Sequence, residues 1–371
     1  MSPDSPPLPE AWRPALEAIA ALPEGGAALL LAATDRGKTT FATLVARVLA
    51  ESVGRVAVAD ADIGQSEIGP PGTVGVAWAD PAAVKMAELK PFGLYFVGAL
   101  GAQALPLEHA VATARAVQAA RDAGARRILL DTTGFVTGPV ACRLKVAKAT
   151  LCRPALVIAL ERDGDGLDNL VRAACAAAPG GAKALRLPVP PEVGRKSPTL
   201  RATRRLSRLS RAVLDAREVA LPLDSVATLG ATLGTGRPIP PDQAQWAGTA
   251  LRLPVVYAEN ADGVLTLYLD GPVPRPGWES EAGAITAHFK ARSIRALSLP
   301  AHRDVLLGLH DGAGKLLGLG RFLRLDPERL HLVVAARLSE AAAERVRLVA
   351  FGRARAAADG APGPEVRPGE L

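Results

Sequence analysis

A short segment near the amino terminus has the residue types of a phosphate-binding loop. Residues 32–40 read AATDRGKTT and follow the apolar run Ala27–Leu31. A loop of the form G-x-x-x-x-G-K-[ST] holds phosphates because successive backbone N–H groups point into one concavity at the start of a helix. Gly37 permits the tight backbone, Lys38 can reach the outer phosphates, and the Thr39 hydroxyl can face a magnesium ion. The segment therefore predicts a nucleotide-phosphate site.

One residue departs from this pattern. Ala32 stands where the motif has its first glycine, and its methyl group could crowd the turn. Two interpretations follow: a working loop with a tolerated alanine, or a chance GKT on an alanine-rich helix. The strand-loop-helix context favours the working loop.

Acidic and amide side chains follow the next apolar run. RVAVAD ends at Asp60 and continues into DADIGQSEIGPPGTVG, which contains Asp62 and Gln65. Ligands of open α/β sheets bind at the carboxyl ends of the strands, so we expect these side chains beside the loop. A carboxylate there can hold magnesium through water or accept a proton from an attacking hydroxyl. The alternative is an acidic, glycine-rich turn without a chemical role.

The apolar pattern predicts the elements that position these groups. Strands are predicted at 27–31, 55–60, 93–99, 126–131 and 155–161, and helices at 39–50, 106–123 and 138–151. This alternation is typical of a parallel sheet with helices on both faces. We therefore predict an α/β fold with a P-loop NTPase-type parallel sheet.

The amino-acid composition of the chain changes near residue 190. A proline-rich and arginine-rich segment is followed, beyond Ala220, by short alternating runs with D-G turns, which predict antiparallel strands in a smaller β-rich domain. The predicted parts are a lead (1–25), a P-loop domain (26–219) whose last segment is arginine-rich (190–219), a β-rich C-terminal domain (220–356) and a disordered tail (357–371).

Bulk composition limits the class of protein. The 371 residues carry a net charge of +7, which suggests a polyanionic partner such as nucleic acid, although an arginine-rich proteome explains it equally. The start of the chain is acidic and proline-rich, and charged residues interrupt every long apolar run, so we predict a cytoplasmic protein without a membrane span. Cys142, Cys152 and Cys175 fall in no C-x-x-C pattern and are predicted to be reduced thiols.

Several motifs in order resemble the Clp1/Grc3 family of polynucleotide 5′-hydroxyl kinases. They read TDRGKTT, DADIGQSEIGPPGTVG, DTTGFVTG, YFVGALGA and KVAKATLCRPALVIALER, and the carboxyl-terminal segments GLHDGAGKLLGLGRF and VRLVAFGRARAAADG continue the resemblance. It spans most of residues 27–360. The resemblance implies transfer of the ATP γ-phosphate to the 5′-hydroxyl end of RNA or DNA with Mg²⁺ as cofactor.

The resemblance also implies roles for individual positions. Asp62 would be the general base on the 5′-hydroxyl, and Gln65 would lie beside the metal with Asp62 and Thr39. Residues expected to bind the nucleotide are Thr34, Asp35, Arg36, Gly37, Lys38, Thr39 and Thr40. Residues expected to form the clasp over the substrate are Gln65, Thr132, Thr133, Gly134 and Phe135, where Phe135 replaces a tryptophan of the family. Asp131, with Asp60, is expected to support the waters of the metal; the alternative is that Asp131 caps the next turn.

An arginine-rich helix matches the R-x-x-R lid of that family. Arg201 and Arg204 have the required spacing, and so do Arg205 and Arg208, so the register stays open. An arginine that closes over the migrating phosphoryl group stabilises its charge. The alternative is a solvated arginine-rich surface.

A second class of function competes with the kinase. A nucleotide-binding scaffold in RNA processing would keep the fold and ATP but little catalysis, and Ala32 and Phe135 favour it. The sequence leaves the choice between RNA and DNA, the protein partners and the oligomeric state open.

Overall fold

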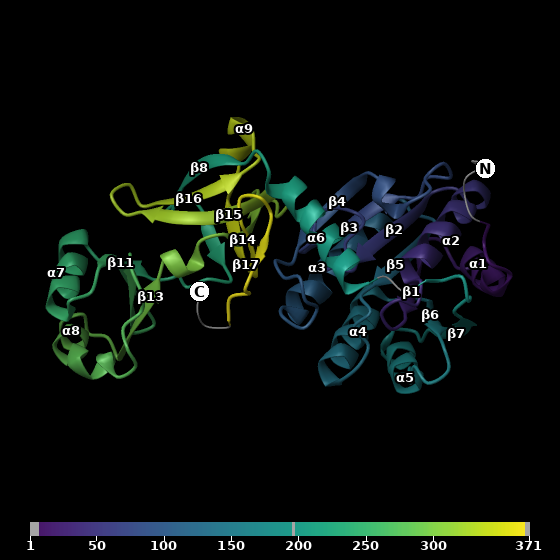
Figure 1. Cartoon of the computed structure of the whole chain (residues 1–371), viewed down its shortest axis with the longest axis horizontal. Helices are drawn as coiled ribbons and strands as arrows, with labels where there is room; N and C mark the ends of the chain where they lie inside the picture. The colour runs from purple at the N-terminus through teal and green to yellow at the C-terminus, as the bar shows by residue number, and fades with distance from the viewer. Residues whose placement is uncertain (1–6, 195–196, 368–371) are drawn as a thin grey trace. The chain divides into compact units, whose positions relative to one another are not determined.

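The computed structural model describes residues 7–194 and 197–367, and its chain forms two compact units, Met1–Arg208 and Leu209–Leu371 (Figure 1). The division falls inside helix α6 (Pro198–Val213), before the predicted boundary at residue 219. The arginine-rich helix therefore begins in the first unit and ends in the second.

The first unit contains one sheet with the strand order β4-β3-β2-β5-β1-β6-β7. The strands are β1 (Gly26–Leu31), β2 (Val56–Ala61), β3 (Thr73–Trp78), β4 (Pro91–Phe96), β5 (Arg127–Thr132), β6 (Leu156–Glu161) and β7 (Lys183–Pro188). From β2 through β5, β1 and β6 to β7 each neighbouring pair is parallel. The carboxyl ends of β2, β5 and β1 are therefore adjacent at one edge, where the predicted motifs follow them.

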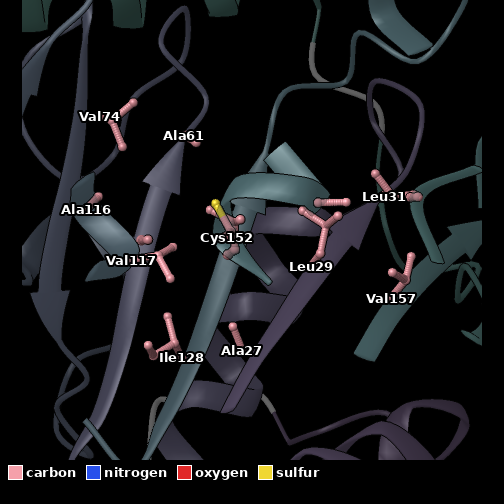
Figure 2. Packing of buried hydrophobic residues seen from close by; sticks show 14 of the residues in the cluster. Ala27, Leu29, Leu31, Ala61, Val74, Ala116, Val117, Ile128, Cys152 and Val157 are labelled. Carbon is pink, nitrogen blue, oxygen red and sulfur yellow. The ribbon is translucent and has the colours of Figure 1, made fainter. Parts of the chain in front are cut away.

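Helices cover both faces of this sheet, as predicted. Their bounds are α1 (Arg13–Ala20), α2 (Lys38–Ser52), α3 (Pro106–Asp122), α4 (Pro139–Cys152) and α5 (Asp168–Ala177). One apolar core joins the sheet to α3, α4 and α5, and the other joins it to α1 and α2. Figure 2 shows the first core, in which Ala27, Leu29 and Leu31 of β1 share a face with Val157 of β6 and Cys152 of α4. The period of two along β1 sends the intervening Ala28 and Leu30 to the opposite core.

The predicted parallel sheet is present, and it also contains one antiparallel strand, β3, near its edge. The segment TVGVAW, part of which was assigned to a connecting motif, forms β3, and β3 pairs antiparallel with both β2 and β4. The chain turns back because the Asp60 carboxylate accepts the backbone N–H groups of Asp62, Glu67 and Ile68. A Cβ at Gly75 would lie 2.0 Å from the carbonyl oxygen of Ile68, so this close return requires glycine.

The described part of the amino-terminal lead, residues 7–25, belongs to the first unit, and residues 1–6 of that prediction lie outside the described residues. Trp12 is buried, its ring meets Phe41 edge-on at 5.2 Å, and its indole N–H donates to the carbonyl oxygen of Pro188 at 3.2 Å. Ile19 of α1 is buried in the same core. The helix α1 thus covers the α2 face of the sheet.

The second unit is rich in β-structure. One sheet has the order β18-β17-β14-β15-β16-β8, with β9 paired to β17, and the other has the order β10-β11-β12-β13. The strands are β8 (Arg217–Pro222), β9 (Ala227–Leu229), β10 (Arg237–Pro238), β11 (Val255–Ala261), β12 (Val264–Leu269), β13 (Ser293–Ser298), β14 (Val305–His310), β15 (Leu316–Asp326), β16 (His331–Ala336), β17 (Leu348–Ala356) and β18 (Pro362–Gly363). The helices are α7 (Pro241–Leu251), α8 (Gly283–His288) and α9 (Glu340–Ala343). Most neighbouring pairs are antiparallel, but the pairs β12–β13 and β9–β17 are parallel.

The predicted disordered tail is ordered where the structure describes it. Within residues 357–367, β18 pairs with β17 and Val366 is buried, so the segment packs on the second unit. Residues 368–371 of that prediction lie outside the described residues. Cys142, Cys152 and Cys175 are free thiols, as predicted. Within the described ranges, the helices are too short or too polar to cross a bilayer.

Candidate active site

A cavity of about 1050 Å³ lies at the carboxyl ends of β1, β2 and β5 in the first unit. Its walls include residues from each of the four predicted motifs. They are Thr34, Asp35, Arg36, Gly37, Lys38, Thr39, Thr40, Asp62, Gln65, Thr133, Gly134, Phe135, Arg201 and Arg205. The fold therefore brings to one cavity side chains that are far apart in the sequence.

The loop after β1 has the backbone of an anion site. Gly37 has φ +76° and caps the amino terminus of α2, and Asp35 also has a positive φ of 59°. A Cβ at Gly37 would lie 2.8 Å from a methyl carbon of Val193. Glycine is thus needed at position 37 both for the left-handed backbone and for space.

The side chain of Lys38 lies inside the loop. Its Nζ donates to the carbonyl oxygens of Ala32 and Ala33, each at 3.0 Å, and the side chain is 7% exposed. Burial lowers the pKa of Lys38, while the negative charges of Asp131 and Asp62 oppose that shift. The ammonium group is thus held by two backbone dipoles beside the cavity.

Ala32 packs into the core. Its side chain is fully buried in the cluster that contains Leu30 and Phe41, and it is not among the residues that line the cavity. The methyl group therefore occupies core space on the α2 side of the sheet.

Asp131 is the penultimate residue of β5 and lies beside the loop. Its Oδ2 accepts the hydroxyl of Thr39 at 2.8 Å, whereas its buried Oδ1 has no hydrogen-bond partner within the described residues. Burial raises the pKa of Asp131 to about 6, opposed by the charge of Lys38. A threonine hydroxyl and a carboxylate with a spare oxygen are hard oxygen ligands of the kind that Mg²⁺ and its waters prefer.

Asp60, near the end of β2, and Asp62, directly after β2, have different surroundings. Asp60 is buried and accepts three backbone N–H groups of the following turn, and burial together with the charge of Asp131 raises its pKa to about 8. Asp62 is half-buried and lines the cavity, and its carboxylate accepts the N–H of Gln65 at 3.2 Å. Asp60 therefore shapes the turn that presents Asp62 and Gln65 to the cavity.

The clasp residues follow β5. Thr133, Gly134 and Phe135 line the cavity, while Thr132 is fully buried and donates its hydroxyl to the carbonyl oxygen of Leu30 at 2.6 Å. A Cβ at Gly134 would lie 2.5 Å from the hydroxyl oxygen and 2.7 Å from the Cα of Thr34. Only glycine lets the clasp approach the phosphate-binding loop this closely.

The candidate lid arginines divide by their contacts. Arg201 lines the cavity and forms an ion pair with Asp35 at 2.6 Å, and Arg205 lines it and donates to the carbonyl oxygen of Gly64 at 3.0 Å. Arg208 binds the side chain of Glu67 and the carbonyl oxygen of Ser66. Arg204 is exposed and is not a lining residue. One member of each R-x-x-R pair thus reaches the cavity, because positions 201 and 205 share a helix face.

One contact of the loop was not expected. Arg36 donates two hydrogen bonds to the carboxylate of Asp165, at 2.7 and 2.6 Å, and this pairing lowers the pKa of Asp165. Asp165 lies in the glycine-rich turn after β6, the strand next to β1. The sequence signal was present as RDGDG at the end of a predicted strand, but nothing in it identified Arg36 as the partner.

Known proteins share both the sequence and the fold. Residues 32–211 match the family model of the P-loop of the mRNA cleavage and polyadenylation factor CLP1. A polyribonucleotide 5′-hydroxyl-kinase of Thermococcus kodakarensis is 30% identical over 356 residues, which cover 95% of this chain and 94% of the relative. The enzyme of the same name from Pyrococcus furiosus is 26% identical over 355 residues, covering 95% and 94%.

A solved structure resembles the chain in fold. In the complex of wild-type Clp1p with a Pcf11p fragment, the matching chain superposes with a TM-score of 0.55 at 11% identity, over 92% of this chain and 77% of that chain. With the relative from Thermococcus at 30% identity over nearly the whole of both chains, the comparisons show the family. This chain belongs to the Clp1 family of P-loop kinases.

Proposed function

We propose that the chain is an ATP-dependent polyribonucleotide 5′-hydroxyl kinase, which transfers the γ-phosphate of ATP to the 5′-hydroxyl of RNA. The observation that carries the proposal is that one cavity is lined by a phosphate-binding loop, Asp62, the clasp and two arginines. The relatives are called polyribonucleotide 5′-hydroxyl-kinases, which supports RNA over DNA as the substrate.

The loop would bind the ATP phosphates. Lys38, Thr39 and Thr40 at the start of α2 line the cavity, and their backbone N–H groups would bind phosphate oxygens. Lys38 would exchange the carbonyl oxygens of Ala32 and Ala33 for phosphate oxygens. Phosphoryl transfer requires positioning and charge stabilisation above all, and a preorganised loop supplies both. Arg36, fixed by Asp165, would hold the shape of the loop during this exchange.

Asp62 would accept the proton of the 5′-hydroxyl. It is the aspartate of the motif that lines the cavity, whereas the carboxylate of Asp60 is occupied by three backbone donors. Thr39, Asp62, Gln65 and Asp131 would hold Mg²⁺ and its waters. When bound, the ion neutralises charge on the phosphates. Arg201 would leave Asp35 to face the migrating phosphoryl group.

A catalytically weak ATP-binding scaffold is the alternative. The departures at Ala32 and Phe135 favour it. However, the Ala32 methyl group lies in the core, and Phe135 keeps an aromatic wall on the cavity. The cytoplasmic location predicted from the sequence remains part of the proposal, and the free thiols agree with a reducing compartment.

Transfer of label from γ-labelled ATP to RNA tests the proposal. The substrate is a 5′-hydroxyl RNA oligonucleotide, with the 5′-phosphorylated RNA and the 5′-hydroxyl DNA of the same sequence as controls, each with and without EDTA. We expect label on the 5′-hydroxyl RNA in the absence of EDTA and not in its presence. The phosphorylated control should carry no label. ATP binding without transfer to either 5′-hydroxyl strand would overturn the kinase and favour the scaffold.

A further inference from the structure

Three basic side chains are buried beneath the clasp. Lys145 and Lys148 lie on α4 and His109 lies on α3, and all three are 0% exposed. Buried lysines are rare because removing an ammonium group from water is costly unless hydrogen bonds offset the loss. None of the three was among the predicted site residues, so each requires a physical explanation.

Lys145 is held by the clasp itself. Its Nζ lies 2.7 Å from the hydroxyl oxygen of Thr132, 2.7 Å from the carbonyl oxygen of Thr133 and 3.2 Å from the hydroxyl oxygen of Thr133. An ammonium group has three N–H donors, and this cage offers three acceptors. Burial lowers the pKa of Lys145 well below its usual value. A neutral amine would still donate to Thr132 and to the Thr133 carbonyl while accepting from the Thr133 hydroxyl, so the cage suits either protonation state.

The same contacts continue to the phosphate-binding loop. The Thr132 hydroxyl, which accepts from Lys145, donates to the carbonyl oxygen of Leu30 at 2.6 Å, and Leu30 lies in the strand that leads into the loop. Gly134 contacts Thr34 of the loop so closely that a Cβ would not fit. Lys145, the clasp and the loop therefore form one connected set.

We propose that Lys145 is a positioning residue that fixes Thr132–Gly134 against the phosphate-binding loop, and so sets the place of Thr133 and Phe135 in the cavity wall. Its effect on turnover rests on the proposed kinase function; its effect on clasp order does not. Lys145 is fully buried and is not a lining residue of the cavity, so it acts through the clasp.

Lys148 provides a matched control on the same helix. It is equally buried, but its Nζ lies 2.7 Å from Nε2 of His109 and, within the described residues, makes no hydrogen bond to the clasp. Nε2 of His109 also lies 2.9 Å from the carbonyl oxygen of Ala61. When Lys148 is removed, His109 can donate its Nε2 proton to Ala61 without competition. Lys148→Met thus removes a buried amine and leaves the clasp contacts in place.

The experiment compares Lys145→Met with Lys148→Met in the full chain. Hydrogen exchange is measured on peptides that cover the clasp and the loop, and kcat and KM are measured for ATP and RNA. For Lys145→Met we expect exchange at the clasp to be about tenfold faster and kcat to fall about tenfold or more, the equivalent of one lost buried hydrogen bond or more. Both KM values should stay within about threefold, since substrate contacts are intact. Lys148→Met should match the wild type in clasp exchange and kcat.

The outcomes separate the two proposals. Wild-type clasp exchange in Lys145→Met, or equal losses in both variants, would overturn the positioning role, because a general loss of core packing affects both alike. If the wild type transfers no phosphate, the kinase proposal fails, and clasp exchange still decides the role of Lys145. Should Lys145→Met not fold, the isosteric Thr132→Val removes the hydroxyl between Lys145 and Leu30. Thr132→Val should then give the same faster hydrogen exchange at the clasp. Wild-type exchange at the clasp in Thr132→Val would overturn the proposal.

Discussion

The two units of the chain use buried carboxylates differently. In the first unit, Asp131 keeps one buried oxygen without a partner among the described residues, beside a lysine and a threonine that line a cavity. In the second unit, Glu259 is 1% exposed and its two oxygens accept from Tyr268 at 2.6 Å, Tyr257 at 3.3 Å and the N–H of Gly234 at 3.1 Å. Burial and the charge of Glu259 raise the pKa of both tyrosines, which therefore remain donors.

This difference separates a ligand site from a structural one. The hydrogen-bonding capacity of Glu259 is used by strands β11 and β12 and the turn at Gly234, so its charge supports the fold. The hydrogen-bonding capacity of Asp131 is partly unused, and its other oxygen binds Thr39, which lines the cavity. A buried charged group with unused capacity is costly unless a ligand completes it. Changes at Asp131 and at its neighbours Lys38 and Thr39 should therefore affect turnover, and changes at Glu259 should affect stability.

The largest effect is expected at the loop lysine. Lys38→Met removes the charge that would bind the ATP phosphates, and we expect transfer to fall by about a thousandfold, the upper range for loss of one transition-state donor. The thermal unfolding temperature should change little, because the methionine keeps the length of the buried stem. Rates of labelled-phosphate transfer and a melting curve provide the measurement. Wild-type turnover would remove the loop from the mechanism.

The next effect separates two arginines of α6. Arg201 lines the cavity, so Arg201→Ala should lower kcat by about ten- to a hundredfold with modest change in KM. Arg204 is exposed, so Arg204→Ala should leave kcat at saturation unchanged and lower the salt slope of RNA binding by about one. The measurements are steady-state kinetics and binding over a salt series. A loss of kcat in Arg204→Ala without one in Arg201→Ala would contradict the assignment of Arg201 to the lid.

A smaller effect, on stability alone, is expected in the second unit. Glu259→Gln has nearly the same shape, but its amide group turns one acceptor into a donor that faces a tyrosine hydroxyl or a backbone N–H. We expect a loss of about 1–3 kcal/mol in the free energy of unfolding, measured in urea, and wild-type kcat. A large loss of kcat in a folded variant would break the distinction between the units.

The smallest effect is expected at the unusual loop residue. Ala32→Gly removes one buried methyl group from the core and adds nothing to the cavity, so ATP affinity and kcat should stay within a few-fold. ATP titration and transfer kinetics give the comparison. A large gain in turnover would mean that Ala32 had switched the enzyme off, and would favour the scaffold.

The sequence predicted the central fold and most of the cavity. Apolar runs followed by G-K-T, by D-x-D and by T-x-G placed three motifs at the carboxyl ends of parallel strands, and β1, β2 and β5 are neighbours in the sheet. The antiparallel β3 was not predicted, because the glycine-rich segment before it resembles a loop until the hydrogen bonds to Asp60 are known. The order of residues 357–367 was not predicted either, because strand pairing overrides a glycine- and proline-rich composition.

The buried lysines show the limit of residue-type reasoning. Lys145 and Lys148 fall on the same stripe of α4 as the buried Ala141, Leu144 and Ala149. The spacing of that stripe was visible in the sequence, but a lysine at an apolar position is usually interpreted as solvent-exposed. Only the positions of Thr132 and Thr133 show what the Lys145 amine binds.

Single-turnover transfer by Asp62→Asn, beside Asp60→Asn, tests the central claim most directly. Each variant is first bound to ATP and 5′-hydroxyl RNA, and the reaction is then started by adding Mg²⁺. ATP affinity and unfolding temperature are measured separately for both variants. We expect Asp62→Asn to transfer phosphate about a hundredfold or more slowly, with ATP affinity within a few-fold and an unchanged melting temperature, because it loses the proton acceptor but keeps one oxygen that can face the metal. Asp60→Asn should instead lower the melting temperature, since its amide cannot accept all three backbone donors. Wild-type transfer by Asp62→Asn would contradict the proposal that this aspartate is the base.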